Sequence, residues 1–498
     1  MAAPRVLVGI DLGQTACKAT ALEPERGIVA AAAQGYVTAQ PHVGWAEQDP
    51  ADWLAAATAC CRELGLAPGT KVVGVAVTGA THNFVLIDAA GAPVRPAITL
   101  RDGRATEQAE RLNEKLGPEL LRRARNVASA GWTAPQLAWI SEHEPRVWRR
   151  ARGLLFAKDY LRAGITGMAA TDYIEAEGSL LLNADDHQWD PLLCAAVPID
   201  PAWLPPVLAP AQPAGRLGAE FARAAGLPPG APVYAGCSDT AAEALASGTV
   251  APGQGIVKLA TAGNVNIVSD RPRPSPGYFT YSHPAGGVYH SYGTNAAAAS
   301  RAWLQGLLGA TAAEDYRTLD QEAERVPAAA GGLLFHPYLY GERAPVFDSS
   351  LRASFIGLTG RHGRAHLVRA VLEGVALSLA ECARAASESG LEIAELRIIG
   401  GGARSRLWCQ ILADALAQPM LVPAMSDASA GAALLAGVGA GAFTDPAAAA
   451  RRHAGVRRKI VPDPRATTLY AELLELYREA RDQLTPLSRR LAELGREA

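Results

Sequence analysis

The chain has 498 residues, a length that favours two or more domains. With 47 Lys plus Arg against 49 Asp plus Glu, its formal net charge is -2, so it lacks the excess positive charge that attracts nucleic acid or an anionic membrane. Hydrophobic residues make up 49% and charged residues 19%, a balance that excludes wholesale disorder.

The seven cysteines are an odd number without Cys-x-x-Cys spacing, which indicates neither a disulfide framework nor a zinc cluster. The N-terminus has no basic region before a long apolar stretch, so no signal peptide is expected. The uncharged run at residues 428–443 is shorter than the roughly 20 residues that cross a bilayer, and we predict a buried small-residue helix there. These features favour a cytoplasmic protein.

The first predicted element is a β-hairpin, in which the strand VLVGI leads into a glycine-containing turn and a second alternating run. Asp11 ends the first strand. Gly13, Gln14 and Thr15 can direct backbone N–H and hydroxyl groups at a phosphate, and Lys18 follows them. An acid beside a phosphate usually serves Mg²⁺ or its waters, although the same pattern also fits a hairpin without a ligand.

Further along the chain we expect a helix at 52–64 and strands at 72–77, 84–88 and 232–236. This alternation indicates an α/β architecture. The last of these strands runs into GCSDTAAEALASG, where Asp239 opens a helix. Asp239 is then either a helix N-cap or a carboxylate that accepts a proton from a substrate hydroxyl as its oxygen attacks phosphorus.

A second hairpin is predicted at 253–268, with Lys258 in the place of Asp11 and a small polar turn containing Thr261 and Gly263. Two hairpins so far apart suggest two related domains. One carboxylate and two phosphate-sized turns suit a nucleoside triphosphate with one metal centre.

The segment LRIIGGGARSRLW predicts a strand, three glycines at 400–402 and a helix. Without side chains, these glycines would let a flat ring or a ribose lie against the backbone, and the alternative is a tight strand-to-helix turn. The chain has neither a GxxxxGK[ST] loop nor a GxGxxG after its first strand, so P-loop and Rossmann nucleotide sites are not supported.

The C-terminal region begins with a basic cluster between Arg451 and Lys459 that has no interleaved aromatic residues, so we interpret it as a solvated face. A helix with apolar residues at helical spacing follows, and we expect Thr468 as its N-cap and the first domain as its packing partner. Glycine and proline are concentrated near 245–252, which favours a domain boundary there.

Ten segments between residues 5 and 443 resemble the FGGY carbohydrate kinases in their order and spacing, with the xylulokinase branch as the nearest. They are GIDLGQTACKATAL, GWAEQDPADW, TGATHNFVLID, LRDGRA, GWTAPQLAW, FAKDYLRAGITG, GCSDTAA, PYLYGERAPVFD, HGRAHLVRAVLEGVALSL and GGGARSRLWCQILADAL.

The resemblance implies two actin-like ATPase domains of the ribonuclease-H type with a cleft between them, and ATP-dependent phosphorylation of a sugar hydroxyl with Mg²⁺. We expect residues 1–247 to hold the sugar and phosphate site and 248–443 the nucleotide site, with a basic linker and amphipathic helices at 444–498. The expected substrate is a ketopentose such as D-xylulose, converted to D-xylulose 5-phosphate.

By position in the family's motifs, Asp239 matches the catalytic base and Asp11 the magnesium-associated acid, while Thr81, His82 and Asp102 match the sugar site. Another set matches the nucleotide site: Thr261, Gly263, Gly401, Gly402 and Ser405. Together with the first turn, Gly13, Gln14, Thr15 and Lys18, this set forms the predicted ATP site.

Three departures from the family pattern leave the sugar open. The chain reads ATAG at 260–263 where the family usually has GTSG, Thr81–His82 where it has Met-His, and Leu100–Arg101 where it often has an aromatic residue and Asn. The alternatives are a ribulokinase, another ketose or polyol kinase and a kinase for a signalling sugar. The oligomeric state is also open, with a homodimer as one option.

Outside the sugar kinases, one alternative is a chaperone or filament ATPase of the same fold, which predicts a peptide-binding or polymerising extension that the segment after 443 does not suggest. Another is a sugar-responsive regulator, which would be expected to lose Asp11 or Asp239, and the chain has both.

Overall fold

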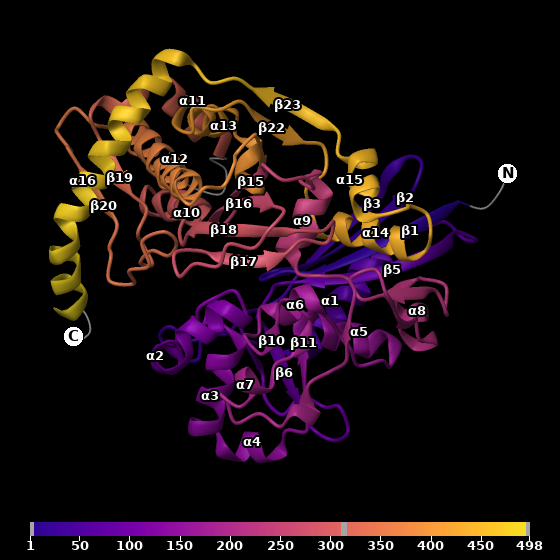
Figure 1. Ribbon diagram of the computed structural model, residues 1–498. Helices are drawn as coiled ribbons and strands as arrows, with labels where there is room; N and C mark the ends of the chain where they lie inside the picture. The colour runs from indigo at the N-terminus through magenta and orange to yellow at the C-terminus, as the bar shows by residue number, and fades with distance from the viewer. Residues whose placement is uncertain (1–3, 310–315, 495–498) are drawn as a thin grey trace. The chain divides into compact units, whose positions relative to one another are not determined.

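The computed structural model describes residues 4–309 and 316–494, which form two compact α/β units (Figure 1). Unit 1 comprises residues 1–250, 271–288 and 425–454, and unit 2 comprises residues 251–270, 289–424 and 455–498. The predicted α/β class is confirmed. Within the described ranges, no helix is both long and apolar enough to cross a membrane.

Unit 1 has one main sheet with smaller strand pairs around it. Its strands are β1 (Arg5–Leu12), β2 (Ala16–Glu23), β3 (Gly27–Gly35), β4 (Glu47–Gln48), β5 (Lys71–Gly79), β6 (Phe84–Ile87), β7 (Ala97–Ile98), β8 (Gly153–Phe156), β9 (Thr171–Asp172), β10 (Leu182–Asn183), β11 (Gln188–Trp189), β12 (Val207–Leu208), β13 (Pro213–Arg216) and β14 (Pro232–Tyr234). The residues of unit 1 also include β17 (Phe279–Ser282), which belongs neither to the main sheet nor to these pairs.

The helices of unit 1 include two that come from the far end of the chain. They are α1 (Pro50–Glu63), α2 (Thr106–Arg123), α3 (Thr133–His143), α4 (Pro145–Arg150), α5 (Ala157–Thr166), α6 (Tyr173–Glu177), α7 (Pro191–Cys194), the 3₁₀ turn η1 (Pro201–Trp203), α8 (Ala219–Ala225), α9 (Asp239–Ser247), α14 (Ala428–Gly439) and α15 (Pro446–His453).

The main sheet of unit 1 has the order β13-β14-β5-β1-β2-β3. The predicted first hairpin is confirmed, since β1 and β2 pair antiparallel. β1 is also parallel to β5, and β5 is parallel to β14. Because parallel strands end on the same edge of a sheet, the residues that follow β1, β5 and β14 meet there.

Helix α14 lies directly on β1 and β2, although more than 400 residues separate them along the chain (Figure 1). A Cβ atom on Gly9 would lie 1.8 Å from the carbonyl oxygen of Ser429, so the helix approaches the strand backbone at a position where only glycine fits. The hydroxyls of Thr20 and Ser429 are hydrogen-bonded at 2.6 Å. The predicted buried small-residue helix is therefore confirmed, and it covers the strand that carries Asp11.

Unit 2 is built around the second hairpin. Its strands are β15 (Gln254–Leu259), β16 (Gly263–Ser269), β18 (Val288–Thr294), β19 (Leu334–His336), β20 (Ser354–Ile356), β21 (Glu395–Ile399), β22 (Met420–Pro423) and β23 (Val456–Ile460). Its helices are α10 (Ala298–Leu307), α11 (Tyr316–Glu324), η2 (Ala328–Gly331), α12 (Arg364–Glu388), η3 (Gly401–Arg404), α13 (Arg406–Ala415) and α16 (Pro464–Leu494).

The sheet of unit 2 confirms the second predicted hairpin, with β15 antiparallel to β16. β15 is also parallel to β21, which is parallel to β22, so the turns after β15 and β21 lie on the same edge. The basic segment ends α15 and then forms β23, which pairs antiparallel with β22.

Two expectations about the C-terminal helix are wrong. α16 begins at Pro464, and Thr468 lies inside it, where its hydroxyl donates to the Pro464 carbonyl at 3.1 Å. The side chain that accepts at the helix start is Asp463, from Arg465 N at 2.8 Å, because proline suits the first helical position and leaves capping to the residue before it. The helix also packs within unit 2 and not on the first domain, as its Tyr470 hydroxyl donates to Glu373 at 2.7 Å.

Candidate functional site

The sheet of unit 1 brings Asp11 and the turn before Asp239 to one edge. Asp11 pairs with Thr78 of β5, and the next β5 residue, Gly79, forms a parallel bridge to Ser238. The Thr78 hydroxyl donates to the Cys237 carbonyl at 2.5 Å and ties the two segments together. Asp11 and Asp239, which are 228 positions apart in the sequence, are thus carried by segments that lie two strands apart in the sheet, about 10 Å between backbones.

Asp11 is only 5% exposed, and its Oδ1 has no hydrogen-bond partner in the described part of the chain. Burial raises the pKa of Asp11 well above its ordinary value, and the carboxylates of Asp239, Asp427 and Glu243 raise it further, whereas Lys18 lowers it. A buried oxygen without a partner, among several carboxylates, fits a bound cation.

The side chains around Asp11 suit Mg²⁺ better than a metal ion whose ligands all come from protein side chains. No group of three or more His, Cys, Asp or Glu side chains arranged to hold a metal occurs among the described residues. Mg²⁺ typically takes one or two carboxylates, keeps several waters and completes its shell with substrate phosphates. Asp11 is therefore the residue of this edge that would hold the ion.

Asp239 is the first residue of α9, and the N-cap position belongs to Ser238. The N-cap interpretation of Asp239 is thus wrong. Asp239 Oδ1 accepts from Thr240 N at 2.6 Å and from the Thr240 hydroxyl at 3.2 Å, so the carboxylate is oriented by its neighbour. The turn before it depends on Gly236, whose φ is +77° and whose added Cβ would lie 1.7 Å from the Val77 carbonyl oxygen.

Part of the hydrogen-bonding capacity of the predicted phosphate turn at the end of β1 is used within the turn itself. Gly13 N donates to the Ala16 carbonyl at 3.1 Å, and Thr15 is exposed. Both polar atoms of the Gln14 amide are buried without a hydrogen-bond partner within the described ranges. Gln14 is therefore the turn residue with unused hydrogen-bonding capacity.

Lys18 lies beside this turn but is held by Asp427, whose Oδ2 is 2.7 Å from Lys18 Nζ. Asp427 also caps α14, accepting from Ser429 N at 3.1 Å. Asp427 is not among the site residues predicted from the sequence. The signal available was an aspartate immediately before an alanine-rich helix, which predicts a cap but not a partner for Lys18.

His82, one of the predicted sugar residues, has both ring nitrogens engaged. Its Nδ1 donates to the Gly178 carbonyl at 2.7 Å, so its Nε2 accepts, and the Tyr281 hydroxyl lies 3.3 Å from it. The ring stacks on Trp132 with centroids 4.2 Å apart. Burial lowers the pKa of His82 to about 4, so the imidazole is neutral at physiological pH.

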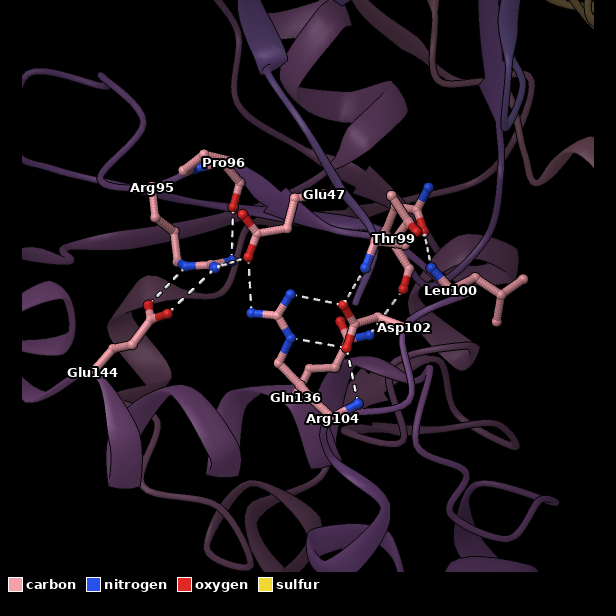
Figure 2. A network of polar contacts seen from close by, with 11 residues as sticks. Glu47, Arg95, Pro96, Thr99, Leu100, Asp102, Arg104, Gln136 and Glu144 are labelled. Carbon is pink, nitrogen blue, oxygen red and sulfur yellow. Dashed lines mark hydrogen bonds and ion pairs between the residues drawn. The ribbon is translucent and has the colours of Figure 1, made fainter. Parts of the chain in front are cut away.

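Asp102, the third predicted sugar residue, is bound on both oxygens by the protein itself (Figure 2). Arg104 donates Nε to Oδ1 at 2.8 Å and NH2 to Oδ2 at 2.7 Å, and Ala46 N donates to Oδ2 at 2.6 Å. The guanidinium of Arg104 also lies 3.6 Å from the centre of the Trp45 ring. The carboxylate thus has a structural contact on each oxygen before any sugar binds.

The same network continues away from Asp102 through Glu47, which Figure 2 shows between two arginines. Glu47 Oε1 lies 2.8 Å from Arg104 NH1 and 2.6 Å from Arg95 NH2, and Arg95 Nε lies 2.8 Å from Glu144 Oε2. These side chains are mostly buried, with exposed fractions between 1% for Arg104 and 22% for Glu144, so removing one of them would leave a largely buried charge without its partner.

In unit 2 the predicted nucleotide residues fall in two turns. Gly263 is the first residue of β16 and pairs with Leu259, so the turn itself is residues 260–262. Thr261 is exposed, and its carbonyl accepts from Ala297 N and Ala299 N at 3.0 and 3.1 Å, at the start of α10. These bonds fix the turn and leave the Thr261 side chain at the surface of the unit.

The glycine turn after β21 has one open and one crowded position. A Cβ on Gly401 would meet nothing within 4 Å, whereas a Cβ on Gly402 would lie 2.6 Å from the Leu259 Cβ. Ser405, predicted at the nucleotide, is the N-cap of α13 and accepts from Trp408 N at 3.0 Å. Of these three residues, Gly401 offers the open backbone surface.

Two buried glutamates near His82 were also missed. Glu175 accepts from His82 N at 3.2 Å, and Glu177 accepts from Ser282 N at 2.7 Å and from the Ser282 hydroxyl at 2.5 Å. Both lie on α6, which Asp172 caps. A buried glutamate has no characteristic sequence pattern, so these positions become visible only in the structure.

Sequence and structure comparisons agree on one family. Models of the N-terminal and C-terminal domains of the FGGY family of carbohydrate kinases match residues 6–246 and 259–440. The xylulose kinase of Bacillus subtilis (strain 168) is 31% identical over 486 residues, which cover 95% of this chain and 96% of that protein. The chain belongs to the FGGY family of carbohydrate kinases.

Further matches agree with this. The crystal structure of xylulose kinase from Rhodospirillum rubrum matches with a TM-score of 0.87 at 30% identity, covering 97% of this chain and 100% of that one. The gluconokinase of Bacillus subtilis (strain 168) is 27% identical over 448 residues, 87% of each chain. The predicted actin-like fold and the assignment as an ATP-dependent phosphotransferase are thus confirmed, whereas the roles of individual site residues stay predictions.

A pH-dependent stability of this FGGY kinase follows from Glu177. Burial raises its pKa to about 7 from an ordinary value of 4.5. Between these two pH values the folded protein therefore keeps a proton on Glu177 that the unfolded chain loses. The stabilisation from this proton is complete below pH 4.5 and is lost as the pH rises through 7, with a loss of ~3 kcal/mol at most. The side chain in Glu177→Gln stays neutral at both pH values. The difference in thermal midpoint between this variant and the parent should therefore increase by several degrees from pH 5 to pH 8.

Thermal unfolding at both pH values checks this expectation. Glu220→Gln removes an exposed carboxylate and serves as the matched control, with no difference expected between pH 5 and pH 8. A Glu177→Gln shift that does not change with pH would show that Glu177 is ionised in the folded protein.

Proposed function

We propose that this kinase phosphorylates a ketose with ATP and Mg²⁺, and that its substrate is D-xylulose, converted to D-xylulose 5-phosphate. The matched relatives named as xylulose kinases, at 30–31% identity over nearly the whole chain, support the substrate. The observation that supports the chemistry is the placement of Asp11 and the turn of Asp239 on one edge of the unit 1 sheet.

In the proposed reaction Asp239 is the general base. Its carboxylate takes the proton of the sugar hydroxyl while that oxygen forms a bond to the γ-phosphorus, and the bond from this phosphorus to the bridging oxygen of ADP breaks. The contacts from Thr240 occupy Oδ1, which leaves Oδ2 as the oxygen for the proton. Mg²⁺, held through Asp11, would neutralise phosphate charge.

Nucleotide-binding roles are proposed residue by residue within each unit. In unit 1, Gly13, Gln14, Thr15 and Lys18 are proposed at the phosphates, and in unit 2 Thr261, Gly263, Gly401, Gly402 and Ser405 at the nucleotide. The exposed side chain of Thr261 and the open face of Gly401 support direct contacts. Gly263 and Gly402 are crowded by neighbouring protein atoms, and the Ser405 hydroxyl already accepts from Trp408 N. These three residues would then act by shaping the turns.

A substrate panel tests the proposal. D-Xylulose, D-ribulose, D-fructose, glycerol and D-gluconate are compared by sugar-dependent ADP release, and NMR of the product locates the phosphate. We expect D-xylulose to give the highest kcat/KM and the 5-phosphate as product. Preference for D-gluconate, the substrate named for the gluconokinase relative, would overturn the ketose assignment while leaving the carbohydrate kinase in place.

The turn at 260–262 gives a separate prediction. Thr261→Val keeps the shape of the side chain but removes its hydroxyl, so KM for ATP should rise about three- to tenfold while KM for the sugar stays within twofold, as expected for one lost hydrogen bond. Steady-state kinetics with each substrate varied checks this. Thr359→Val, at another exposed threonine of unit 2, is the control. A change confined to the sugar KM would contradict the assignment of this turn.

The proposed location is the cytoplasm, supported by seven cysteines that are all buried free thiols. A homodimer stays a prediction, which light scattering on the purified enzyme tests.

A further inference from the structure

The turn formed by Thr81 and His82 is held from several sides by parts of unit 1 distant in sequence. Glu175 Oε1 accepts from His82 N at 3.2 Å, and the Thr133 hydroxyl donates to His82 O at 3.0 Å. The Gly178 carbonyl accepts from His82 Nδ1 at 2.7 Å. Both backbone polar groups of His82 and its ring are therefore fixed.

This support matters because the backbone of His82 is strained. Its φ is +75°, in the left-handed region that non-glycine residues seldom adopt, so the conformation persists only where surrounding contacts favour it. The bond from His82 N to Glu175 is one such contact. Without an acceptor there, the amide would be a buried donor lacking a partner.

Gly178 supports the same turn by steric contact. Its φ is -64° and its ψ is -12°, which any residue adopts, so the glycine is not required by the backbone. A Cβ added to Gly178 would instead lie 2.7 Å from Thr81 Cγ2 and 2.9 Å from His82 Nδ1. Helix α6 and Gly178 thus fit closely against both residues of the turn.

We propose that Glu175 is a positioning residue for the carbohydrate: by accepting from His82 N it holds the left-handed turn and thereby sets the direction of the Thr81 hydroxyl toward a sugar hydroxyl. This inference rests on the proposed assignment of Thr81 and His82 to the sugar site. Both ring nitrogens of His82 already bond to protein, whereas the Thr81 hydroxyl has no hydrogen-bond partner among the described residues, so it is the group of this turn that remains for the ligand.

The chemical state of Glu175 suits this role. It is 1% exposed, and its Oε2 lacks a hydrogen-bond partner within the described ranges. Burial raises its pKa well above the ordinary value, and the carboxylates of Asp172, Asp159 and Asp239 raise it further, against the opposing effect of Lys158. The raised pKa favours the neutral acid, which holds the turn without adding a negative charge near Asp239, so a glutamine should replace Glu175 in function.

The test compares Glu175→Ala with Glu175→Gln in the full-length enzyme. The alanine variant loses the acceptor for His82 N, so KM for the sugar should rise at least about tenfold while KM for ATP changes less than twofold. The glutamine variant keeps an acceptor oxygen and should recover the sugar KM to within about threefold of the parent. Glu373→Ala, which removes an equally buried glutamate from unit 2, controls for general destabilisation and should leave the sugar KM unchanged.

A second variant covers the case in which Glu175→Ala does not fold. Gly178→Ala adds a methyl group against Thr81 and His82 and should also raise the sugar KM selectively. Gly117→Ala, where a Cβ meets nothing within 4 Å, is the matched control.

An unchanged sugar KM in folded Glu175→Ala, or in Gly178→Ala, would overturn the proposal, as would a glutamine variant as impaired as the alanine one. The kinetics use whichever carbohydrate the substrate panel identifies. If D-xylulose is not that carbohydrate, the proposed substrate fails, while the role of Glu175 is still tested with the true one.

Discussion

Replacing Asp239 with asparagine is expected to lower kcat by at least about a hundredfold, because an amide of the same shape cannot take the proton of the attacking hydroxyl. The asparagine still accepts from Thr240 N, so the thermal midpoint should stay within a few degrees of the parent and both substrates should still bind. Steady-state kinetics, calorimetric binding of sugar and nucleotide, and thermal unfolding check these three expectations.

Asp445→Asn is the matched control, since Asp445 also stands at a helix start and caps α15 by accepting from Ala448 N at 2.7 Å. Asparagine caps a helix about as well as aspartate, so this variant should turn over like the parent. Near-parental turnover of folded Asp239→Asn would contradict the assignment of the base. Asp11 would then be the next carboxylate to test, because both oxygens of Asp102 are taken by Arg104 and Ala46.

Gly236→Ala should destabilise unit 1 by several kcal/mol and abolish activity. The left-handed φ of +77° alone costs an alanine about 1–2 kcal/mol, and its Cβ would in addition lie 1.7 Å from the Val77 carbonyl oxygen, so β5 and the turn must separate. Since that turn carries Ser238 and Asp239, the base would move with it. Thermal unfolding and kcat measure the two effects.

Gly230 provides a control with almost the same backbone. Its φ is +75°, but a Cβ there meets nothing within 4 Å, so Gly230→Ala should show the conformational cost alone and keep full activity. Equal midpoints for the two variants would mean that the turn near Val77 relaxes without loss, contrary to the close contact.

The regular elements were predictable because their signals are local. Alternating residues and a turn identify each hairpin, and strand-to-helix junctions such as that at Asp239 follow from composition. Thr468 shows the limit of such signals: threonine is a common N-cap, but here a proline and an aspartate one turn earlier define the helix start.

The candidate site was predictable in its residue types and not in their partners. That Asp11 and Asp239 share an edge follows from strand order, which spacing along the chain does not encode. His82, Asp102 and Lys18 match motif positions, yet their polar atoms bond to Gly178, Arg104 and Asp427, and only the folded chain shows this. The proposed role of Glu175 depends on its hydrogen bond with the backbone N–H of His82, which no side-chain pattern in the sequence indicates.

The contact between Gly9 and Ser429 constrains the order in which the enzyme can mature on a ribosome. The strand that carries Asp11 emerges first, but the helix that covers it begins at residue 428, so it is synthesised roughly 20–80 s later at ~5–20 residues per second. During that interval the apolar face of β1 needs another cover, such as a chaperone. Nascent chains arrested before residue 425 should therefore expose this strand to protease, and chains extended beyond 454 should protect it.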